Sequence, residues 1–543
     1  MERIVAFFFF CMCAVAGASA QSCADYEVVP LPQTIEQAAG DAFVLTSGVT
    51  VSFPAANEDM RRNADFLVRY VAEATGINLT IASRKQSDGI RLVIDKNIKG
   101  DEAYTLKVNA KGIIIAGSTA RGVFYGIQTL RKSLPTGAHS TVDMPAVNIT
   151  DSPRFVHRGM MLDCARHFFN LDFVKRYIDL IAMHNMNVFH WHLSDDQGWR
   201  IEIKKYPDLV NIGSKRTGTT IGFNTMLDDS IPYGGYYTQE QAREIVEYAR
   251  QRYITVIPEI DMPGHMLAAM TAYPHLGCTG GPYEVAHRWG VSEEVLCLGN
   301  EKVYGFCEDV LDEIMDIFPS KRIHIGGDET PTVSWEHCPK CRKVAEDNNL
   351  TFNKLQGFFT ERIEKYVNSK GRTIVGWDEL LDGTVTQSAT IQSWRDAEHG
   401  LIAAEAGHDV IMSPTSHCYF DYNQAEADKA KYEPTLCGGF VSVEKVYGFE
   451  PCAANLSEKA RPHIIGVQAN VWTEYLWYPN QVEYQVLPRM AALSEVQWTS
   501  GKKDFDAFRT RLVRLRSLYD VYHLTYARHL WPETIVSPWK FDF

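Results

Sequence analysis

The chain has 543 residues and a formal net charge of −13, with 45% hydrophobic and 22% charged residues. This composition is normal for a globular protein with a sizeable core, and the length predicts a large barrel together with a smaller domain. The negative net charge argues against nucleic acid as a partner and is compatible with a neutral or cationic substrate.

The first twenty residues have the features of a secretory signal peptide. Arg3 precedes an apolar run over residues 4–16, and Ala18-Ser19-Ala20 matches the small-x-small pattern of a cleavage site. The run is too short to span a membrane, and no other stretch is long and apolar enough to be a transmembrane segment. We therefore expect residues 1–20 to be removed and the protein to be secreted or periplasmic. Two alternatives stay open: a buried N-terminal helix, and lipid anchoring at Cys23, which lacks the usual preceding aliphatic residue.

Ten of the twelve cysteines follow this segment. Cys278 and Cys297 flank a Gly-rich loop, and Cys338 and Cys341 form a single CxxC. Cysteines of an exported protein are candidates for disulfides, whereas a structural zinc needs four ligands and no second CxxC is present. We therefore favour a loop disulfide or free thiols over a metal site, and we expect neither a metal nor a cofactor.

Residues 21–150 predict a small α+β domain. Apolar alternation and helical spacing place strands at 43–53, 91–94, 104–108 and 111–117, and helices at 60–74 and 120–134. Ala110-Lys111-Gly112 is expected to form a hairpin turn, and the segment 145–153 is expected to be the domain boundary. No group of candidate catalytic residues occurs in this part of the sequence.

From Arg158 onward, short apolar runs alternate with longer amphipathic stretches. Eight strands are expected, at 159–162, 188–191, 254–257, 322–325, 373–376, 390–392, 409–412 and 464–468. Helices are expected at 173–184, 239–251, 302–317, 353–369, 398–406 and 483–498. The alternation predicts an α/β fold, a (β/α)8 TIM barrel over residues 154–500, followed by a helical tail over 501–543. An open doubly wound sheet is the alternative, although its Gly-rich phosphate loop is missing.

Charged and aromatic residues follow all eight expected strands. In chain order they are Asp163 and Arg166; His192, Asp195 and Asp196; Glu259 to His265; Asp328 and Glu329; Trp377; Trp394; Tyr419 and Asp421; Trp472 and Glu474. Barrel enzymes carry their active sites at this end of the strands. Tryptophan rings stack on sugars while carboxylates and arginine bind hydroxyls, so the set predicts a pocket for one sugar ring. Taken singly, each residue also has a structural explanation, such as core packing for a tryptophan or an ion pair for Arg166.

Asp328 and Glu329 form the most distinctive short motif in the sequence. Gly326 and Gly327 precede them and allow unusual backbone angles. Two adjacent carboxylates repel and burial disfavours charge, so one is expected to keep its proton near neutral pH, as a general acid requires. A metal site or a surface acidic turn is the alternative. Adjacent side chains diverge and cannot flank a glycosidic bond as in ordinary retaining enzymes. This favours a substrate-assisted mechanism, in which the sugar's own 2-acetamido oxygen attacks the anomeric carbon.

An ordered set of motifs carries a family resemblance. The motifs are Arg158-Gly159-Met160-Met161-Leu162-Asp163 with Arg166-His167, His190-Trp191-His192-Leu193-Ser194-Asp195-Asp196, Asp261-Met262-Pro263-Gly264-His265, His324-Ile325-Gly326-Gly327-Asp328-Glu329 and Trp472-Thr473-Glu474. Together they resemble the β-N-acetylhexosaminidases of glycoside hydrolase family 20, most closely bacterial exo-acting members. The resemblance covers residues 154–500 and, more weakly, the N-terminal domain.

The resemblance implies that the protein removes terminal N-acetylglucosamine or N-acetylgalactosamine from a glycan or chito-oligosaccharide. It implies that Glu329 is the general acid and then the general base, and that Asp328 orients the acetamido group as an oxazolinium ion forms. It implies that Tyr419 hydrogen-bonds the acetamido oxygen and that Trp377, Trp394 and Trp472 form the walls around the sugar. It also implies that Arg166, Asp421 and Glu474 bind the sugar hydroxyls, and that Asp195 and His265 form a network that supports Glu329. The glycan, its linkage and the oligomeric state are left open.

Two other functions compete with this interpretation. A zinc-dependent amidohydrolase would use His190 and His192 with His265 and a late carboxylate, but the bridging lysine and further histidine of such sites are missing. A sugar-binding relative without catalysis would carry a substituted acid, whereas Asp328 and Glu329 are both present. His192 is otherwise interpreted as a buried histidine that supports the site.

Overall fold

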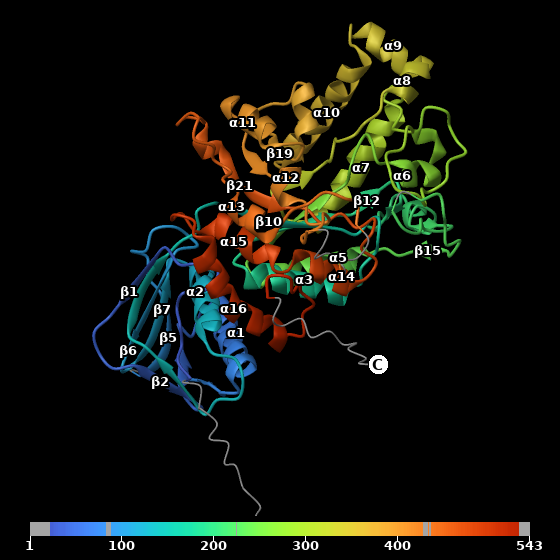
Figure 1. Ribbon diagram of the computed structural model, residues 1–543. Helices are drawn as coiled ribbons and strands as arrows, with labels where there is room; N and C mark the ends of the chain where they lie inside the picture. The colour runs from blue at the N-terminus through green and yellow to red at the C-terminus, as the bar shows by residue number, and fades with distance from the viewer. Residues whose placement is uncertain (1–21, 83–87, 224, 427–432, 434–435, 532–543) are drawn as a thin grey trace, which may run out of the picture.

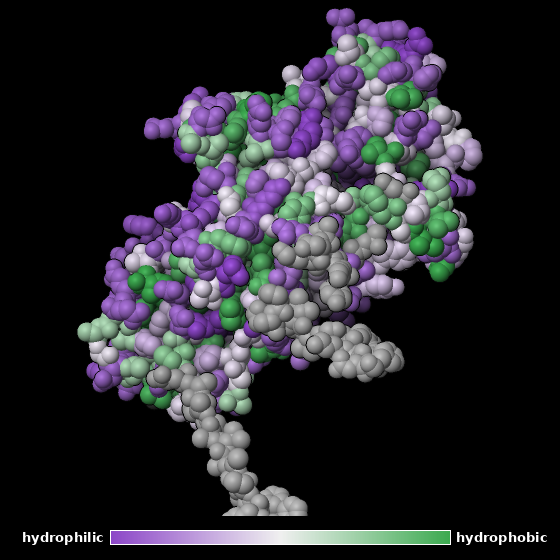
Figure 2. Space-filling model, in the orientation of Figure 1, coloured by the Kyte–Doolittle hydropathy of each residue, from purple (hydrophilic) through white to green (hydrophobic). Residues whose placement is uncertain are grey.

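The structure is a computed structural model that describes residues 22–82, 88–223, 225–426, 433 and 436–531. The expected signal peptide lies outside the described residues. Figure 1 shows an N-terminal unit of strands and helices, coloured blue, beside a larger barrel that continues through green and orange. The side chains on the visible face are mostly hydrophilic, with hydrophobic residues in small separate areas (Figure 2). Among the described helices, none combines the length and the apolar character needed to cross a membrane.

The N-terminal unit is built on a seven-stranded mixed sheet. Its strand order is β1 (Thr34–Gln37), β9 (Val147–Asp151), β6 (Tyr104–Asn109), β7 (Gly112–Gly117), β5 (Gly89–Ile94), β3 (Thr50–Ser52) and β4 (Thr80–Ile81). Helices α1 (Glu58–Thr75) and α2 (Ala120–Ser133) pack together on one face (Figure 1). The side chain of Asn57 caps the start of α1, and Gly76 ends it in a left-handed conformation with φ of 75°.

The prediction of one strand over 43–53 is wrong. The segment forms β2 (Phe43–Thr46), which pairs with β8 (Thr141–Met144) in a separate sheet, and then β3 in the main sheet. Gly48, with φ of 87°, lies between the two strands and turns the chain. Alternation of apolar residues continues across this turn, so the pattern alone does not reveal the break.

The larger unit is a closed barrel of eight parallel strands, which confirms the predicted (β/α)8 fold. The strands, in order around the barrel, are β10 (His157–Asp163), β11 (Val188–His192), β16 (Thr255–Glu259), β17 (Arg322–His324), β18 (Thr373–Trp377), β19 (Thr390–Ser393), β20 (Val410–Met412) and β21 (Ile464–Ala469). Parallel strands end at the same rim of a closed barrel, so the residues that follow them converge there.

The helices that connect the strands in sequence surround the barrel. The principal ones are α3 (Leu171–Met183), α5 (Gln239–Arg250), α7 (Glu301–Ile317), α10 (Phe352–Ser369), α11 (Ala397–Glu405), α14 (Pro479–Val486) and α15 (Arg489–Trp498). The prediction of one helix over 483–498 is wrong, because the chain breaks at Leu487 and Pro488 into α14 and α15. Proline lacks the backbone N–H and disfavours helical geometry in the residue before it, and Leu487 is extended.

Buried polar contacts join the two units. The Arg158 guanidinium donates to both carboxylate oxygens of Glu102, at 2.8 and 3.0 Å, and to the Tyr125 hydroxyl at 2.9 Å. The indole N–H of Trp498 donates to Asp151 at 3.0 Å. The C-terminal helix α16 (Phe505–Val521) packs against α1 and α2 (Figure 1). The N-terminal sheet therefore stabilises the barrel from outside, away from the rim that carries the candidate site.

Candidate active site

The structure brings the sequence-predicted residues to the C-terminal rim of the barrel. Each follows a different strand: Arg166 after β10, Asp195 after β11, His265 after β16, Asp328 and Glu329 after β17, Trp377 at the end of β18, Trp394 after β19, Tyr419 and Asp421 after β20, and Trp472 and Glu474 after β21. Contacts between side chains from neighbouring strands then connect them into one site, and these contacts determine the environment of each group.

The loop that carries Asp328 and Glu329 depends on glycine. Gly326 and Gly327 have φ of 65° and 95°, and a Cβ atom on Gly326 would lie 1.8 Å from Asp261 Oδ1. Glu329 itself has φ of 44°, an uncommon value for a residue with a side chain. This backbone separates the two acids: Asp328 is buried, whereas the Glu329 side chain is 44% exposed.

Asp328 is paired with Asp261 rather than with its neighbour in sequence. Asp261 accepts a hydrogen bond from the Gly327 amide at 3.0 Å and lies in contact with Asp328. Burial raises the pKa of Asp261 to about 7. Burial, and then the charge of Asp261, raise the pKa of Asp328 well above its usual range. The two buried carboxyl groups therefore retain a proton near neutral pH, and the expectation that Asp328 and Glu329 are the interacting pair is corrected.

His265 lies beside both members of the predicted catalytic pair. Its Nε2 is 3.9 Å from Asp328 Oδ2 and 3.7 Å from Glu329 Oε2, and its Nδ1 is 3.2 Å from Asp195 Oδ1. Burial by itself disfavours the charged ring, but the charge of Asp195 and its hydrogen bond hold the pKa of His265 well above the usual value. The site thus contains a buried imidazolium next to the predicted catalytic carboxyl groups.

Arg166 is fixed by four protein partners. Its Nη2 is 2.9 Å from Asp195 Oδ2, its Nε donates to Gln197 Oε1 at 3.0 Å, and its guanidinium lies 5.0 Å from the ring centre of Trp472. Asp163 also contacts it, at 3.4 Å. The side chain is buried, so its position is set by the protein before any ligand arrives.

Aromatic rings from four strands form one wall of the site. The ring centres of Trp377 and Trp472 are 5.8 Å apart, and Trp394 stacks near Tyr419 with centres 6.2 Å apart. The Trp377 indole donates to Glu259 at 3.0 Å and the Trp394 indole donates to Glu379 at 2.9 Å. These hydrogen bonds fix the ring planes, as a pocket that stacks against a sugar requires.

Two further acids, Asp421 and Glu474, follow β20 and β21 at the same rim. Burial raises the pKa of Asp421 to about 7, and its Oδ1 is buried without a hydrogen-bond partner among the described residues. Burial likewise raises the pKa of Glu474, against the lowering effect of the Arg166 charge. Buried polar atoms are nearly always hydrogen-bonded, so Asp421 Oδ1 is an acceptor available to a ligand hydroxyl.

Glu259 is a central residue that the predicted site did not include. It ends β16, and His190, His192 and His324 all contact its carboxylate, at 2.9, 2.5 and 3.0 Å. The Nε2 atom of His192 lies 2.9 Å from Asp195. Both ring nitrogens of His192 therefore face carboxylates. Among the described residues, no group of metal-ligand atoms combines His190, His192 and His265, as the competing amidohydrolase hypothesis requires. Glu259 is one of the charged residues that follow the third expected strand, so its place at a strand end was the available signal.

Asp261 and Glu379 were also missed. Glu379 follows β18, and burial, with the charge of Asp328, raises its pKa to about 8. A cavity of about 450 Å³ opens beside Glu329 and is lined in part by Glu379, Trp335 and Gln356. Of the sequence-predicted site residues, Glu329 alone is among those that line this cavity.

Several groups of ligand-type atoms are close enough to hold a metal. In the rim they are His190 with Glu259 and His324, Asp195 with Asp196 and His265, and Asp261 with His265 and Asp328. A separate group joins Cys278 and Cys297 to Cys338 and Cys341. The inference that the CxxC lacks further ligands is therefore wrong, because a second loop, distant in sequence, supplies two more thiols.

Comparison with known proteins identifies relatives of both units. The profile described as "Glycosyl hydrolase family 20, catalytic domain" matches residues 155–501, and "Glycosyl hydrolase family 20, domain 2" matches residues 25–152. The beta-hexosaminidase of Porphyromonas gingivalis is 39% identical over 511 residues, which is 92% of this chain and 64% of that protein. This chain thus spans a little under two thirds of that relative's length.

Solved structures agree over nearly the whole chain. The GH20 beta-N-acetylhexosaminidase from Streptomyces coelicolor A3(2) has a TM-score of 0.80 and 31% identity, covering 92% of this chain and 97% of that one. The GH20 exo beta-N-acetylglucosaminidase from Vibrio harveyi, in complex with N-acetylglucosamine, has a TM-score of 0.81 and 31% identity, covering 94% and 79%.

Proposed function

Because this chain belongs to glycoside hydrolase family 20, we propose that it is an exo-β-N-acetylhexosaminidase that hydrolyses terminal, non-reducing N-acetylglucosamine or N-acetylgalactosamine from glycans. The reaction retains the anomeric configuration and proceeds through an oxazolinium intermediate. The observation that carries this proposal is the contrast between Asp328, buried and paired with Asp261, and Glu329, 44% exposed beside a cavity.

Glu329 handles the proton of the leaving group. Its exposed carboxyl adjoins the cavity that would hold the rest of the glycan. It protonates the glycosidic oxygen in the first step and removes a proton from water in the second. Adjacent residues cannot lie on opposite sides of one bond, which supports the substrate's own acetamido oxygen as nucleophile.

Asp328 serves the acetamido group. An ionised Asp328 accepts the acetamido N–H and stabilises the positive charge that develops on the oxazolinium ring. Asp261 raises the cost of ionising Asp328, and the imidazolium of His265, 3.9 Å away, lowers it. Tyr419, from the opposite side of the rim, donates to the acetamido oxygen and so directs it toward the anomeric carbon.

The remaining rim residues hold the sugar ring. Trp377, Trp394 and Trp472 pack against its apolar faces and the acetamido methyl group. Arg166 binds the 3- and 4-hydroxyls, and Asp421 and Glu474 bind the 4- and 6-hydroxyls. The pocket closed by these residues accepts one terminal sugar, which agrees with the exo-acting Vibrio harveyi relative and its complex with N-acetylglucosamine.

Leaving-group dependence tests this division of labour. Glu329→Gln is expected to lower turnover about 10²–10⁴-fold on a natural glycan, and much less on an aryl glycoside whose leaving group needs no proton. Asp328→Asn is expected to lower both rates alike, because the first step always needs the acetamido group. Glu336→Gln, at an exposed carboxylate nearby in sequence, is the matched control and is expected to behave as the wild type.

Equal losses on both substrates in Glu329→Gln would contradict the acid role. A thiazoline analogue of the cyclised intermediate is expected to inhibit strongly, since the site is complementary to that geometry; the absence of inhibition would contradict the substrate-assisted mechanism. A panel of defined glycans, scored for released N-acetylglucosamine and N-acetylgalactosamine, then identifies the sugar and linkage.

We also propose that the protein is exported, on the basis of the signal-peptide pattern of residues 1–20. The mass of the mature chain tests this proposal. Cleavage after Ala20 leaves Gln21 as the first residue, whereas a chain that starts at Cys23 with the added mass of lipid would show anchoring instead. A mature chain that still carries residues 1–20 would contradict export by this signal.

A further inference from the structure

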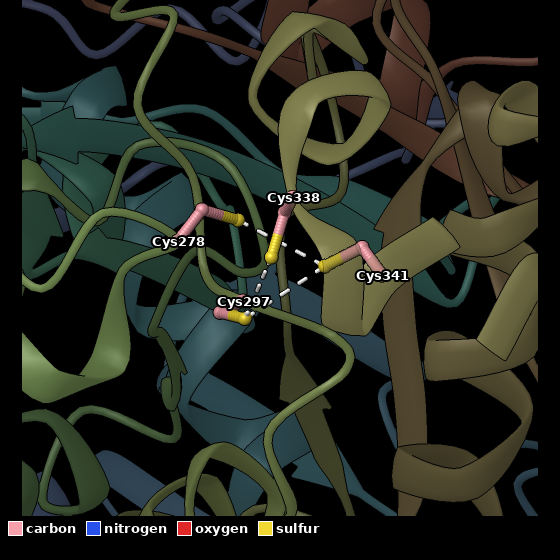
Figure 3. A group of neighbouring side chains, drawn as sticks. All are labelled: Cys278, Cys297, Cys338 and Cys341. Carbon is pink, nitrogen blue, oxygen red and sulfur yellow. Dashed lines mark hydrogen bonds between the residues drawn. The ribbon is translucent and has the colours of Figure 1, made fainter. Parts of the chain in front are cut away.

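Four cysteine side chains converge at one point outside the sugar site. Figure 3 shows Cys278, Cys297, Cys338 and Cys341 pointing their sulfur atoms toward a common centre. Cys278 and Cys297 lie on the long loop after β16, and Cys338 and Cys341 begin helix α9 (Pro339–Asp347) after β17. All four sulfur atoms lie within 4.8 Å of one another. Two segments that are separate in sequence thus contribute two thiols each to this cluster.

The spacing of the sulfur atoms fits tetrahedral metal coordination. A zinc ion bound to four thiolates has Zn–S distances of about 2.3 Å, which places the sulfur atoms about 3.8 Å apart. The observed Sγ–Sγ distances are 3.8 Å for Cys278–Cys341, 3.7 Å for Cys297–Cys338 and 3.7 Å for Cys297–Cys341. Cys297 and Cys341 therefore each have two sulfur neighbours at the same distance, whereas a disulfide would give each sulfur a single partner at about 2.05 Å.

The surrounding backbone favours thiolates. The Gly299 amide donates to Cys341 Sγ at 3.4 Å, and Cys338 is the N-cap of α9, where the helix amides point toward negative charge. Backbone N–H groups that donate to metal-bound sulfur are a common feature of such sites. A Cβ on Gly299 would lie 2.3 Å from the carbonyl carbon of Lys340, so glycine is needed for the loop to approach the CxxC this closely.

We propose that Cys278, Cys297, Cys338 and Cys341 bind one structural zinc ion. Four protein ligands leave no open coordination position, so the ion takes no part in hydrolysis. Its effect is mechanical: it fastens the loop after β16 to the segment that follows Glu329. Between these points the Trp335 indole donates to the Leu296 carbonyl at 2.9 Å and Ser334 Oγ donates to the Glu293 carbonyl at 2.9 Å. Trp335 also lines the cavity beside Glu329, so the metal supports one wall of that cavity.

Metal content and thiol state together test the site. The full mature chain is purified without reductant or added metal and measured by inductively coupled plasma mass spectrometry. One zinc ion per chain is expected. We also expect all four cysteines to be alkylated after denaturation with a chelator and no reductant. A metal-free chain whose four cysteines resist alkylation until reduced would show two disulfides and overturn the proposal, as would a metal-free chain with four free thiols.

Variants test which residues hold the ion. The double change Cys338→Ser with Cys341→Ser is expected to abolish zinc binding, whereas Cys452→Ser, at a half-buried cysteine outside the cluster, is the matched control and is expected to keep one zinc per chain. Zinc retained by the double variant would overturn the assignment. If the double variant does not fold, cobalt replacement in the wild type decides: tetrahedral thiolate coordination gives intense visible bands and sulfur-to-cobalt charge transfer, and their absence from a cobalt-loaded chain would overturn it.

Discussion

Asp195→Asn isolates the electrostatic function of the buried network. The amide keeps the shape of Asp195 and some of its hydrogen bonds to Arg166 and His192, but it removes the negative charge 3.2 Å from His265 Nδ1. That charge is the main influence that opposes burial and keeps His265 protonated. Without it, we expect the buried imidazole to lose its proton near neutral pH.

The consequence for Asp328 follows from distance. His265 Nε2 lies 3.9 Å from Asp328 Oδ2, and a full cation at that distance is worth about 4 kcal/mol at an effective dielectric constant of about 20. This energy corresponds to about three pH units. Loss of the cation therefore raises the pKa of Asp328, which must be ionised to hold the acetamido group. The acidic limb of the kcat/KM profile is expected to move upward by as much as about three pH units.

A pH–rate profile on an activated aryl substrate measures this shift. We expect Asp195→Asn to lose up to about 10³-fold in kcat/KM on the acidic side and to recover activity as the pH rises. Asp196→Asn, which removes a charge 3.3 Å from the same ring nitrogen, is the matched control and is expected to shift the limb less, because Asp195 has the larger effect on His265. A loss of the same factor at every pH, with the limb unmoved, would refute the reasoning.

Two further predictions concern the Asp328 loop. Burial raises the pKa of Asp261 in the folded state from 3.8 to about 7, so the protonated carboxyl stabilises the fold below about pH 4, and this stabilisation is lost at about 1.4 kcal/mol per pH unit up to about pH 7. Asp261→Asn is therefore expected to flatten the dependence of the melting temperature on pH between about pH 4 and pH 7. Parallel melting-temperature curves for the variant and the wild type would contradict the pKa shift. Gly326→Ala is expected to destabilise the protein by about 1–3 kcal/mol and to abolish most activity, because its φ is 65° and the new Cβ would lie 1.8 Å from Asp261. Gly305→Ala, in α7 with open space around it, is its control in the same thermal and kinetic assays; similar losses in both would show a general effect of alanine.

The barrel was predictable because each strand and helix has a local signal. Apolar runs such as β20 and amphipathic helices such as α7 differ in period and length. The incorrect predictions occurred where the hydrophobic pattern continued across a break in the secondary structure. Gly48 divides one alternating segment into two strands, and Pro488 divides one helical segment into α14 and α15. In both places the break depends on one residue, whereas the pattern is an average over many.

The membership of the site was predictable because a closed barrel gathers strand ends at one rim. Which site residues contact one another was not predictable, because these contacts depend on distances between residues far apart in sequence. Asp261 and Asp328 are 67 positions apart yet share a buried contact, and Cys278 lies opposite Cys341 across a similar interval. Sequence spacing favoured Asp328 with Glu329 and Cys338 with Cys341, whereas the fold supplies each group with further partners from another loop.

The loop geometry places two adjacent carboxylic acids in different surroundings, as the proposed division of roles requires. Positive φ angles at Gly326, Gly327 and Glu329 turn successive side chains into different surroundings. Asp328 enters a buried network in which burial and Asp261 raise its pKa and His265 lowers it. Glu329 stays beside the open cavity, where a leaving group and then water can reach it. In the proposed mechanism, a substrate without the 2-acetamido group would leave Asp328 without its partner, and we therefore expect hydrolysis of 2-acetamido sugars only.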